Sequence, residues 1–253
     1  MTGSIASTKR RARIAGILYL LNGILGAFAL LFVYAKVYAP GDAATSARNL
    51  VANAGLVRMG VVADLIQATI WVFLALTLYQ LLKHVSKAAA RAMVVLVALG
   101  AGILMLNEVF GFESLRVATG AVNLASLGAA GSSALVLLLL DAQHYGLLIA
   151  QIFFGLWLVP LGYLAYRSGW FPRALGVALI VGGACYLVDM LAAFLAPDFG
   201  TAIHGYVTLP SAIAELSMVG YLLVVGVKPP KPGELTSAPV APLSRSLPQA
   251  ARG

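Results

Sequence analysis

Residues 14–33 read IAGILYLLNGILGAFALLFV, a run of 20 residues without a single charged side chain. A helix needs about 20 apolar residues to cross the hydrocarbon core of a bilayer. The run follows a basic cluster of Lys9, Arg10, Arg11 and Arg13, and basic residues gather on the cytoplasmic side of membrane spans. We therefore expect residues 14–33 to cross the membrane and residues 1–13 to form a basic cytoplasmic N-terminus.

Five further apolar runs have the length of a membrane span: residues 57–82, 92–117, 146–166, 174–195 and 206–227. The composition agrees, because the chain is 61% hydrophobic and only 10% charged, whereas a soluble domain carries about 25% charged residues. Long unbroken apolar runs favour helices over a β-barrel. The sequence predicts an all-α integral membrane bundle of six transmembrane helices over residues 14–227, with the lipid bilayer as its partner.

The stretch from residue 118 to residue 143 allows an alternative, because the apolar run 134–140 could belong to a seventh span over residues 117–140. With six spans, 13 of the 17 basic residues face the cytoplasm, and Lys36, Arg48, Arg58 and Arg116 face outward. A seventh span would leave seven basic residues inside and ten outside. The positive-inside rule favours six spans, with both termini in the cytoplasm and a loop or short surface helix over residues 118–140.

Two segments outside the spans have recognisable features. Pro40 and Gly41 predict a turn, and Asp42 is placed to accept hydrogen bonds from the first turn of a helix over residues 43–53. We expect this short helix to lie at the outer membrane surface. Residues 228–253 are rich in proline, serine and alanine, which predicts a disordered cytoplasmic tail. The expected location is the inner (plasma) membrane of the cell.

Four acidic residues lie well inside the predicted spans: Asp64, Glu108, Asp189 and Glu215. Carboxyl groups within a membrane are costly and are candidates for function. Counted from the predicted span ends, all four lie roughly 9–14 Å below the outer surface, which suggests one acidic pocket open to the outside. His144, at the outer start of the predicted fourth span, is a further candidate ligand.

Other polar side chains have positions from which they could join this pocket: Gln67, Asn107, Tyr145 and Arg58. If the acids meet, some must carry protons, or a metal ion or Arg58 must neutralise them. Carboxyl ligands with few histidines suit protons or a hard divalent cation better than tetrahedral zinc. The identity of any metal or cofactor stays open. Acids that are separately hydrogen-bonded to neighbouring helices would instead have a structural role.

Three functions remain open at this point. A small transporter, or a binding protein linked to a cation or proton, would use converging acids to hold a small ligand. A non-catalytic structural or sensor subunit of a membrane complex would have dispersed acids, each satisfied by a neighbour. An intramembrane metal-dependent hydrolase would need His144 beside at least two acids. We favour the first function over the second, and both over the hydrolase.

Other classes find little support in the sequence. The net charge of +8 comes from clusters between apolar runs, which is the distribution of membrane topology signals rather than of a nucleic-acid-binding surface. The chain lacks the motifs Gly-x-Ser-x-Gly, His-Glu-x-x-His, Gly-x-x-x-x-Gly-Lys and Gly-x-Gly-x-x-Gly. Its single cysteine, Cys185, excludes an intramolecular disulfide. The sequence does not indicate an enzyme.

Several short motifs occur in an order that is characteristic of one family. They are RIAGILYL (residues 13–20), PGDAA (40–44), VAD (62–64), HYG (144–146), FFG (153–155), LGYL (161–164), RSG (167–169), FPR (171–173) and YLVD (186–189). Together the chain resembles the bacterial membrane family catalogued as domain of unknown function 4386, over roughly residues 9–228, with the weakest likeness at residues 115–135. The resemblance implies a multi-pass membrane protein and supplies no activity.

Overall fold

The computed structural model describes residues 2–228, and every regular element in this part of the chain is helical. The elements in chain order are α1 (Thr2–Ala27), η1 (Phe28–Tyr34), α2 (Ala35–Val37), α3 (Ala43–Ala52), α4 (Ala54–Leu82), α5 (Lys87–Ala118), η2 (Ala125–Leu127), α6 (Gly128–Ser168), α7 (Arg173–Leu195) and α8 (Pro197–Val224). The tail predicted for residues 228–253 lies, apart from its first residue, outside the described residues.

Six of these helical stretches are long and apolar enough to cross a membrane: Ala6–Val37, Ala54–Leu82, Lys87–Ala118, Ala125–Ser168, Arg173–Leu195 and Pro197–Val224. The prediction of six spans is confirmed. Many large apolar side chains point away from the protein; Leu31, Leu106 and Leu216, for example, are each more than 60% exposed. Such surfaces belong in lipid.

Two predictions for the stretch before residue 146 are wrong: the alternative of a seventh span, and the separate short surface helix. Residues 128–168 form one continuous helix, α6, of 41 residues. The sequence between Ala134 and Pro160 contains no proline, so the helix can run through it and the apolar run 134–140 extends the fourth span. At about 60 Å, α6 is longer than a bilayer core is thick. Its first turns pack on α3 and α5.

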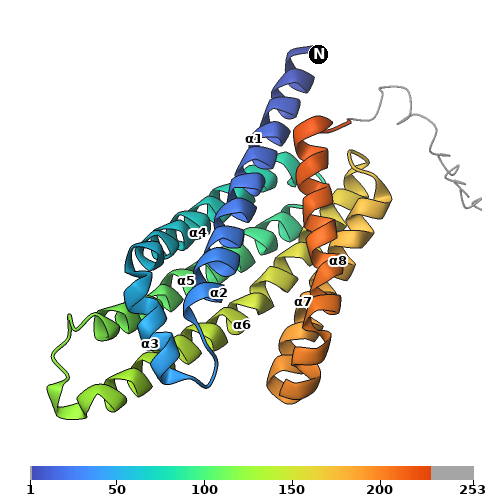
Figure 1. The fold of residues 1–253 in the computed structure, drawn as a ribbon. Coiled ribbons are helices and arrows are strands. Elements are labelled where there is room, and N and C mark those ends of the chain that lie inside the picture. Colours follow the sequence, from blue (N-terminus) through green and yellow to red (C-terminus); the bar gives the residue numbers. More distant parts are fainter. Residues whose placement is uncertain (1, 229–253) are drawn as a thin grey trace, which may run out of the picture.

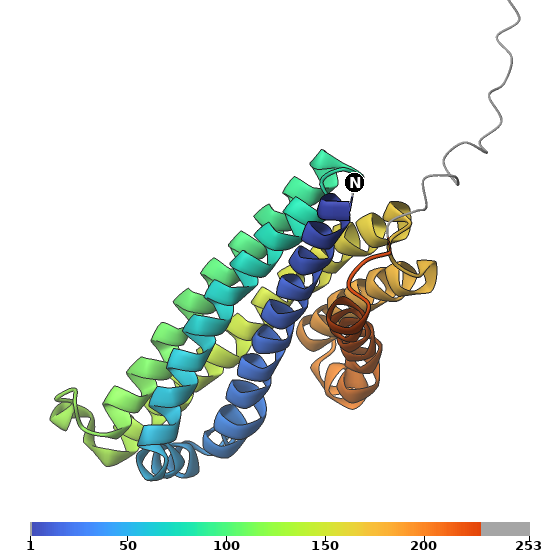
Figure 2. The same ribbon diagram turned by 90° about the horizontal axis from the view of Figure 1, so that it is seen from above.

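The six long helices form a closed ring in chain order (Figures 1 and 2). Each packs on its neighbours in sequence, and α8 returns to pack on α1. In Figure 1, α3, the α5–α6 connection and the α7–α8 turn lie at the end opposite the start of α1. At the end of the bundle where α1 begins, Gly226 approaches the backbone of Lys9. The start of α1 and the end of α8 therefore lie at the same end of the bundle.

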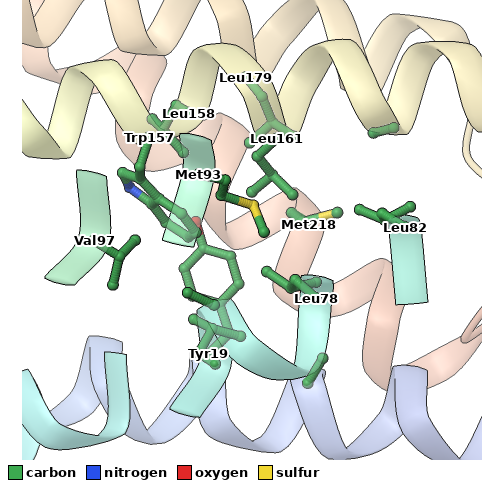
Figure 3. Packing of buried hydrophobic residues seen from close by; sticks show 14 of the residues in the cluster. Tyr19, Leu78, Leu82, Met93, Val97, Trp157, Leu158, Leu161, Leu179 and Met218 are labelled. Atoms are coloured by element: carbon green, nitrogen blue, oxygen red, sulfur yellow. The ribbon is translucent and has the colours of Figure 1, made fainter. Parts of the chain in front are cut away.

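Two apolar clusters fill the ring. The larger one lies toward the end where α1 begins and includes Tyr19, Leu78, Met93, Trp157 and Met218 (Figure 3). The smaller one lies toward α3 and contains Val33, Val37, Leu50, Val57, Leu115, Val117, Val136 and Leu140.

The predicted cap of α3 is confirmed. The Asp42 carboxylate accepts a hydrogen bond from the Thr45 backbone N–H at 2.9 Å and another from the Thr45 hydroxyl at 2.6 Å. These bonds lower the pKa of the Asp42 carboxyl. The position of α3 at a membrane surface stays a prediction.

Candidate functional site

The first side chain of the site, Tyr34, comes from a π-helical segment. η1 (Phe28–Tyr34) interrupts the first span with a wider turn, and π-helical turns occur often at functional sites. Gly60 lets this segment approach α4, because a methyl group at Gly60 would lie 2.9 Å from Val33 Cγ1. The adjacent residue, Tyr34, thereby points toward Asp64, one turn beyond Gly60 on α4.

Tyr34 joins two of the predicted acids. Its hydroxyl lies 2.8 Å from Glu108 Oε1 and 3.4 Å from Asp64 Oδ2, so it donates to Glu108 with Asp64 close beside. The Gln143 amide donates to the Tyr34 hydroxyl and also lies 3.3 Å from Glu108 Oε1. Four helical elements thus meet at one point: η1, α4, α5 and α6. We call Tyr34, Asp64, Glu108 and Gln143 the paired-carboxyl site.

Glycine residues allow α5 and α6 to meet closely beside this site. A methyl group at Gly111 would lie 2.6 Å from Gln143 Oε1, and one at Gly146 would overlap the Asn107 side chain. Asn107 in turn donates from Nδ2 to the Gln143 carbonyl oxygen at 2.8 Å. Each helix thus offers a glycine to the amide side chain of the other, which fixes Gln143 against Tyr34.

Three buried oxygens at this crossing have no hydrogen-bond partner among the described residues: Asn107 Oδ1, Glu108 Oε2 and Gln143 Oε1. Their side chains are 5%, 5% and 3% exposed. A cavity of about 10 Å³ adjoins Tyr34 and Gln143; its other lining residues are apolar, and neither Asp64 nor Glu108 lines it. Its volume is close to the smallest that holds one water molecule. Unpaired buried acceptors are costly, so the crossing has unused capacity for a proton, a water molecule or a cation.

The other two acids lie in a second network. Glu215 accepts from the Tyr19 hydroxyl at 2.7 Å and from the Tyr186 hydroxyl at 3.0 Å, one on each carboxyl oxygen. Asp189 is 1% exposed and accepts from Gln151 Nε2 at 2.7 Å. Gln151 also donates to the Tyr186 backbone carbonyl, so the two acids share one network across α1, α6, α7 and α8.

Asp189 has one further partner, at the end of the network. His204 Nδ1 lies 3.0 Å from both carboxyl oxygens of Asp189, and the His204 side chain is 61% exposed. The predicted fifth and sixth spans leave residues 196–205 as a connection, but α8 begins at Pro197 and includes His204. Because α8 begins earlier than predicted, roughly 27 Å of helix separates Pro197 from Glu215; the depth of Glu215 below the outer surface stays a prediction.

The supporting residues divide between the site and its surroundings. Asn107 lies at the paired-carboxyl site, and Gln67 lies against Gly26 of α1. His144 packs on the rings of Tyr38 and Tyr145. Arg58 is exposed. Within the described range, the ion pairs are Arg116–Glu113 and His204–Asp189, so neither Asp64 nor Glu108 is neutralised by a lysine or arginine.

The described residues do not meet the geometric requirement of the hydrolase hypothesis, which is His144 beside at least two acids. Within residues 2–228, no three His, Cys, Asp or Glu side chains come together closely enough to hold a metal ion. The described ring contacts of His144 are with tyrosines. The oxygen donors of the paired-carboxyl site nevertheless have the chemistry that hard cations or protons require.

Sequence reasoning missed three tyrosines, Tyr19, Tyr34 and Tyr186, which supply hydroxyl donors to the intramembrane acids. For Tyr19 and Tyr186 the available signal was a tyrosine inside an apolar run, whereas Tyr34 directly follows the run 14–33 and gave no such signal. Of the neighbours Gln143 and His144, both of which the sequence offered to the pocket, Gln143 reaches Tyr34 and Glu108, whereas His144 packs on tyrosine rings.

These features define a multi-pass helical membrane protein with carboxyl–tyrosine networks inside its spans. The chain belongs to the family described as domain of unknown function (DUF4386), whose sequence model matches residues 14–226. An uncharacterized protein of Archaeoglobus fulgidus is 39% identical over 46 residues, which cover 18% of this chain and 28% of that protein. No solved structure matches the chain.

Proposed function

We propose that the protein is a small transporter or cation-linked binding protein in which a proton and a hard cation compete for the paired-carboxyl site. The observation that carries the proposal is the meeting of Asp64 and Glu108 at one tyrosine hydroxyl, beside a carboxyl oxygen, Glu108 Oε2, that has no described partner. The ligand takes the place of the missing donor.

Charge gives the physical reason. Two ionised carboxylates side by side in a low-dielectric interior repel each other and lose their hydration. No basic side chain in the described part of the chain pairs with them. One positive charge, carried by a proton or a cation, resolves the repulsion, and the carboxyl oxygens of Asp64 and Glu108 with the Tyr34 hydroxyl oxygen are its ligands.

The arrangement also supports a coupling between ligand and conformation. The four residues of the site come from η1, α4, α5 and α6, so binding stabilises one packing of these elements over others. A ligand shifts a conformational equilibrium only through such differential contacts. The proposal includes the topology expected from the sequence: residues 14–227 in the inner membrane, with cytoplasmic termini and the site nearer the outer side.

The structural-subunit alternative requires every intramembrane acid to be satisfied by neighbours. Glu215, with a tyrosine hydroxyl on each oxygen, meets that requirement. Glu108 differs, because its Oε2 accepts from no N–H or tyrosine hydroxyl among the described residues and the neighbouring group is a second carboxyl, Asp64. This difference favours ligand binding at the paired-carboxyl site.

The test is thermal unfolding in detergent across pH and with Na⁺, Mg²⁺ and Ca²⁺. A ligand bound only to the folded state raises its stability, by about 2.7 kcal/mol at a hundredfold excess over the dissociation constant. We expect Asp64→Asn and Glu108→Gln each to remove this response. Glu113→Gln, on the same helix but paired with Arg116 at the surface, is the matched control and keeps it. A response that survives both site substitutions refutes the proposal.

A further inference from the structure

The end of the bundle where α1 begins carries charge of one sign. Residues 9–13, 83–91 and 167–173, together with Lys228, contain ten lysine and arginine residues and no acidic residue. We call these ten side chains the basic end. They belong to the start of α1, to the segments around the α4–α5 and α6–α7 connections and to the end of α8, which lie together in Figures 1 and 2. All of them except Lys83 are exposed.

Contacts around Trp170 hold these segments together. The Trp170 ring stacks on the ring of His84, in the α4–α5 connection, at a centroid distance of 4.2 Å. The Trp170 carbonyl oxygen accepts a hydrogen bond from the Lys228 N–H at 3.3 Å. Gly226, just before Lys228, approaches the backbone of Lys9 on α1. The basic end is therefore one surface of the folded protein rather than a set of separate loops.

The positive charges of this surface have no carboxylate beside them. Both ion pairs found among residues 2–228 lie elsewhere in the molecule. The Arg173 guanidinium instead lies over the Tyr166 ring at 5.7 Å, and Lys83 Nζ lies over the Tyr79 ring at 5.6 Å. An aromatic ring attracts a cation without carrying a net charge, so these contacts position the two side chains and leave their charge uncompensated.

The opposite end of the bundle shows that this charge is not a general property of the surface. Residues 36–58, residues 113–141 and Asp198 contain four basic and four acidic residues, so their charges balance. The basic end thus differs from the rest of the protein both in the number of its cations and in the absence of acids among them.

We propose that the basic end binds the phosphate headgroups of anionic phospholipids in the surrounding membrane, in preference to zwitterionic lipids. Anionic lipid attracts clusters of lysine and arginine beside membrane spans, and arginine donates paired hydrogen bonds to phosphate. The segments of the basic end adjoin the ends of the spans Ala54–Leu82, Lys87–Ala118 and Arg173–Leu195, which is the level of the headgroups. Trp170 and Tyr166, at the same level, are residue types that gather at this interface.

Charge and apolar surface together select this occupant. Residues 229–253 contain three basic residues and one acidic residue, so the C-terminal segment of the chain carries the same sign as the basic end. The basic ends of two neighbouring copies would repel each other for the same reason. A lipid headgroup has the opposite sign, and its acyl chains can lie against exposed apolar side chains of the adjoining spans, such as Val95 and Val177.

The test compares two lipids with the purified full-length protein. The unfolding temperature is measured in an uncharged detergent, without divalent cations, against increasing dioleoylphosphatidylglycerol or dioleoylphosphatidylcholine. A lipid that binds only the folded protein raises this temperature. One lysine or arginine near an anionic surface favours it by about fivefold, so we expect phosphatidylglycerol to act at a concentration at least about fivefold lower.

Screening tests the electrostatic origin of that preference in the wild-type protein. At about 1 M salt the screening length falls to about 3 Å, so the difference between the two lipids should disappear. The salt is choline chloride, which keeps Na⁺ and its proposed binding at the paired-carboxyl site out of the comparison. A preference that persists undiminished in choline chloride overturns the inference.

Substitutions assign the response to the basic end. Arg167→Gln/Arg173→Gln is expected to reduce the preference for phosphatidylglycerol at least about fivefold, whereas Arg167→Lys/Arg173→Lys keeps both charges and retains most of it. Lys36→Gln/Arg48→Gln removes the same charge from the opposite end and is the matched control, which keeps the preference. Asp64→Asn also keeps it, even where it removes the metal-cation response, so this inference and the proposed function fail separately.

Two soluble anions distinguish other sources of the same charge. Glycerol 1-phosphate carries the phosphate of the headgroup without acyl chains, and polyglutamate stands for an acidic protein segment. We expect neither to reproduce the effect of phosphatidylglycerol. Stabilisation by glycerol 1-phosphate equal to that by the lipid would indicate a site for free phosphate, and stabilisation by polyglutamate alone would indicate an acidic protein partner. Either result, or equal effects of the two lipids, overturns the inference.

Discussion

Tyr34→Phe removes one oxygen atom from the centre of the paired-carboxyl site. In the wild type this hydroxyl donates to Glu108 Oε1 at 2.8 Å and accepts from the Gln143 amide. The substitution leaves the Gln143 side-chain amide with only its 3.3 Å contact to Glu108. It also removes the hydroxyl that lies between the Asp64 and Glu108 carboxyl groups. The aromatic ring itself stays in place, so packing in η1 is preserved.

The magnitude follows from the bonds lost. A hydrogen bond to a charged group is worth about 1.5–3 kcal/mol, and 1 kcal/mol shifts the unfolding temperature of a chain of this size by about 2–4 °C. We expect Tyr34→Phe to lower the unfolding temperature in detergent by roughly 3–12 °C. We also expect the Na⁺, Mg²⁺ or Ca²⁺ concentration needed for stabilisation to rise.

Tyr206→Phe is the matched control for this substitution, because the Tyr206 side chain is 81% exposed. Its unfolding temperature should stay within about 1 °C of wild type, since surface substitutions have small effects. Equal behaviour of Tyr34→Phe and Tyr206→Phe, in stability and in cation response, would show that the Tyr34 hydroxyl does not organise the site.

Three further substitutions test other parts of the account. Gly111→Ala displaces the Gln143 side-chain amide, so we expect a weaker cation response and a lower unfolding temperature. The control is Gly102→Ala, on the same helix with open space around it. In the same assay, this control should be neutral or slightly stabilising. Gly155→Ala would place a methyl group 2.6 Å from the Gly183 carbonyl oxygen, so we expect a loss of about 1–3 kcal/mol in denaturant unfolding; no loss would contradict the close α6–α7 contact. Asp42→Ala should destabilise the start of α3, as measured by hydrogen exchange. Because the pKa of Asp42 is lowered in the folded protein, the stabilisation of α3 by its carboxylate is complete above the ordinary pKa of 3.8 and is lost as the pH falls through the lowered pKa. Equal hydrogen exchange of variant and wild type near neutral pH would refute the cap.

The spans were predictable because lipid imposes a simple rule on the sequence. A span needs about 20 apolar residues, and basic residues mark its cytoplasmic end. The boundaries of the fourth and sixth spans were not predictable in the same way. α6 begins at Gly128 and α8 at Pro197, outside the most apolar windows, because a helix continues beyond the hydrocarbon as long as neighbours pack on it and no breaker intervenes.

The acids of the site were predictable one by one, since a carboxyl group inside an apolar run is conspicuous. Their partners were not. Which acids meet depends on how each helix is rotated and how closely it packs, and these are decided by the π-helical turn before Tyr34 and by Gly60 and Gly111. The sequence therefore indicated one acidic layer, whereas the structure pairs Asp64 with Glu108 and joins Asp189 to Glu215 through a separate network.

Proton release on cation binding tests the central claim most directly. Purified protein in weakly buffered detergent is titrated with the cation that stabilises it, and the protons released are counted with a pH indicator. Competition at the paired-carboxyl site predicts release of about one proton per chain at a pH where the pair is protonated. The Asp64→Asn/Glu108→Gln double variant should release none, and Glu113→Gln should match wild type. Equal release from the double variant and wild type, or cation stabilisation without any proton release at any pH, would contradict the account.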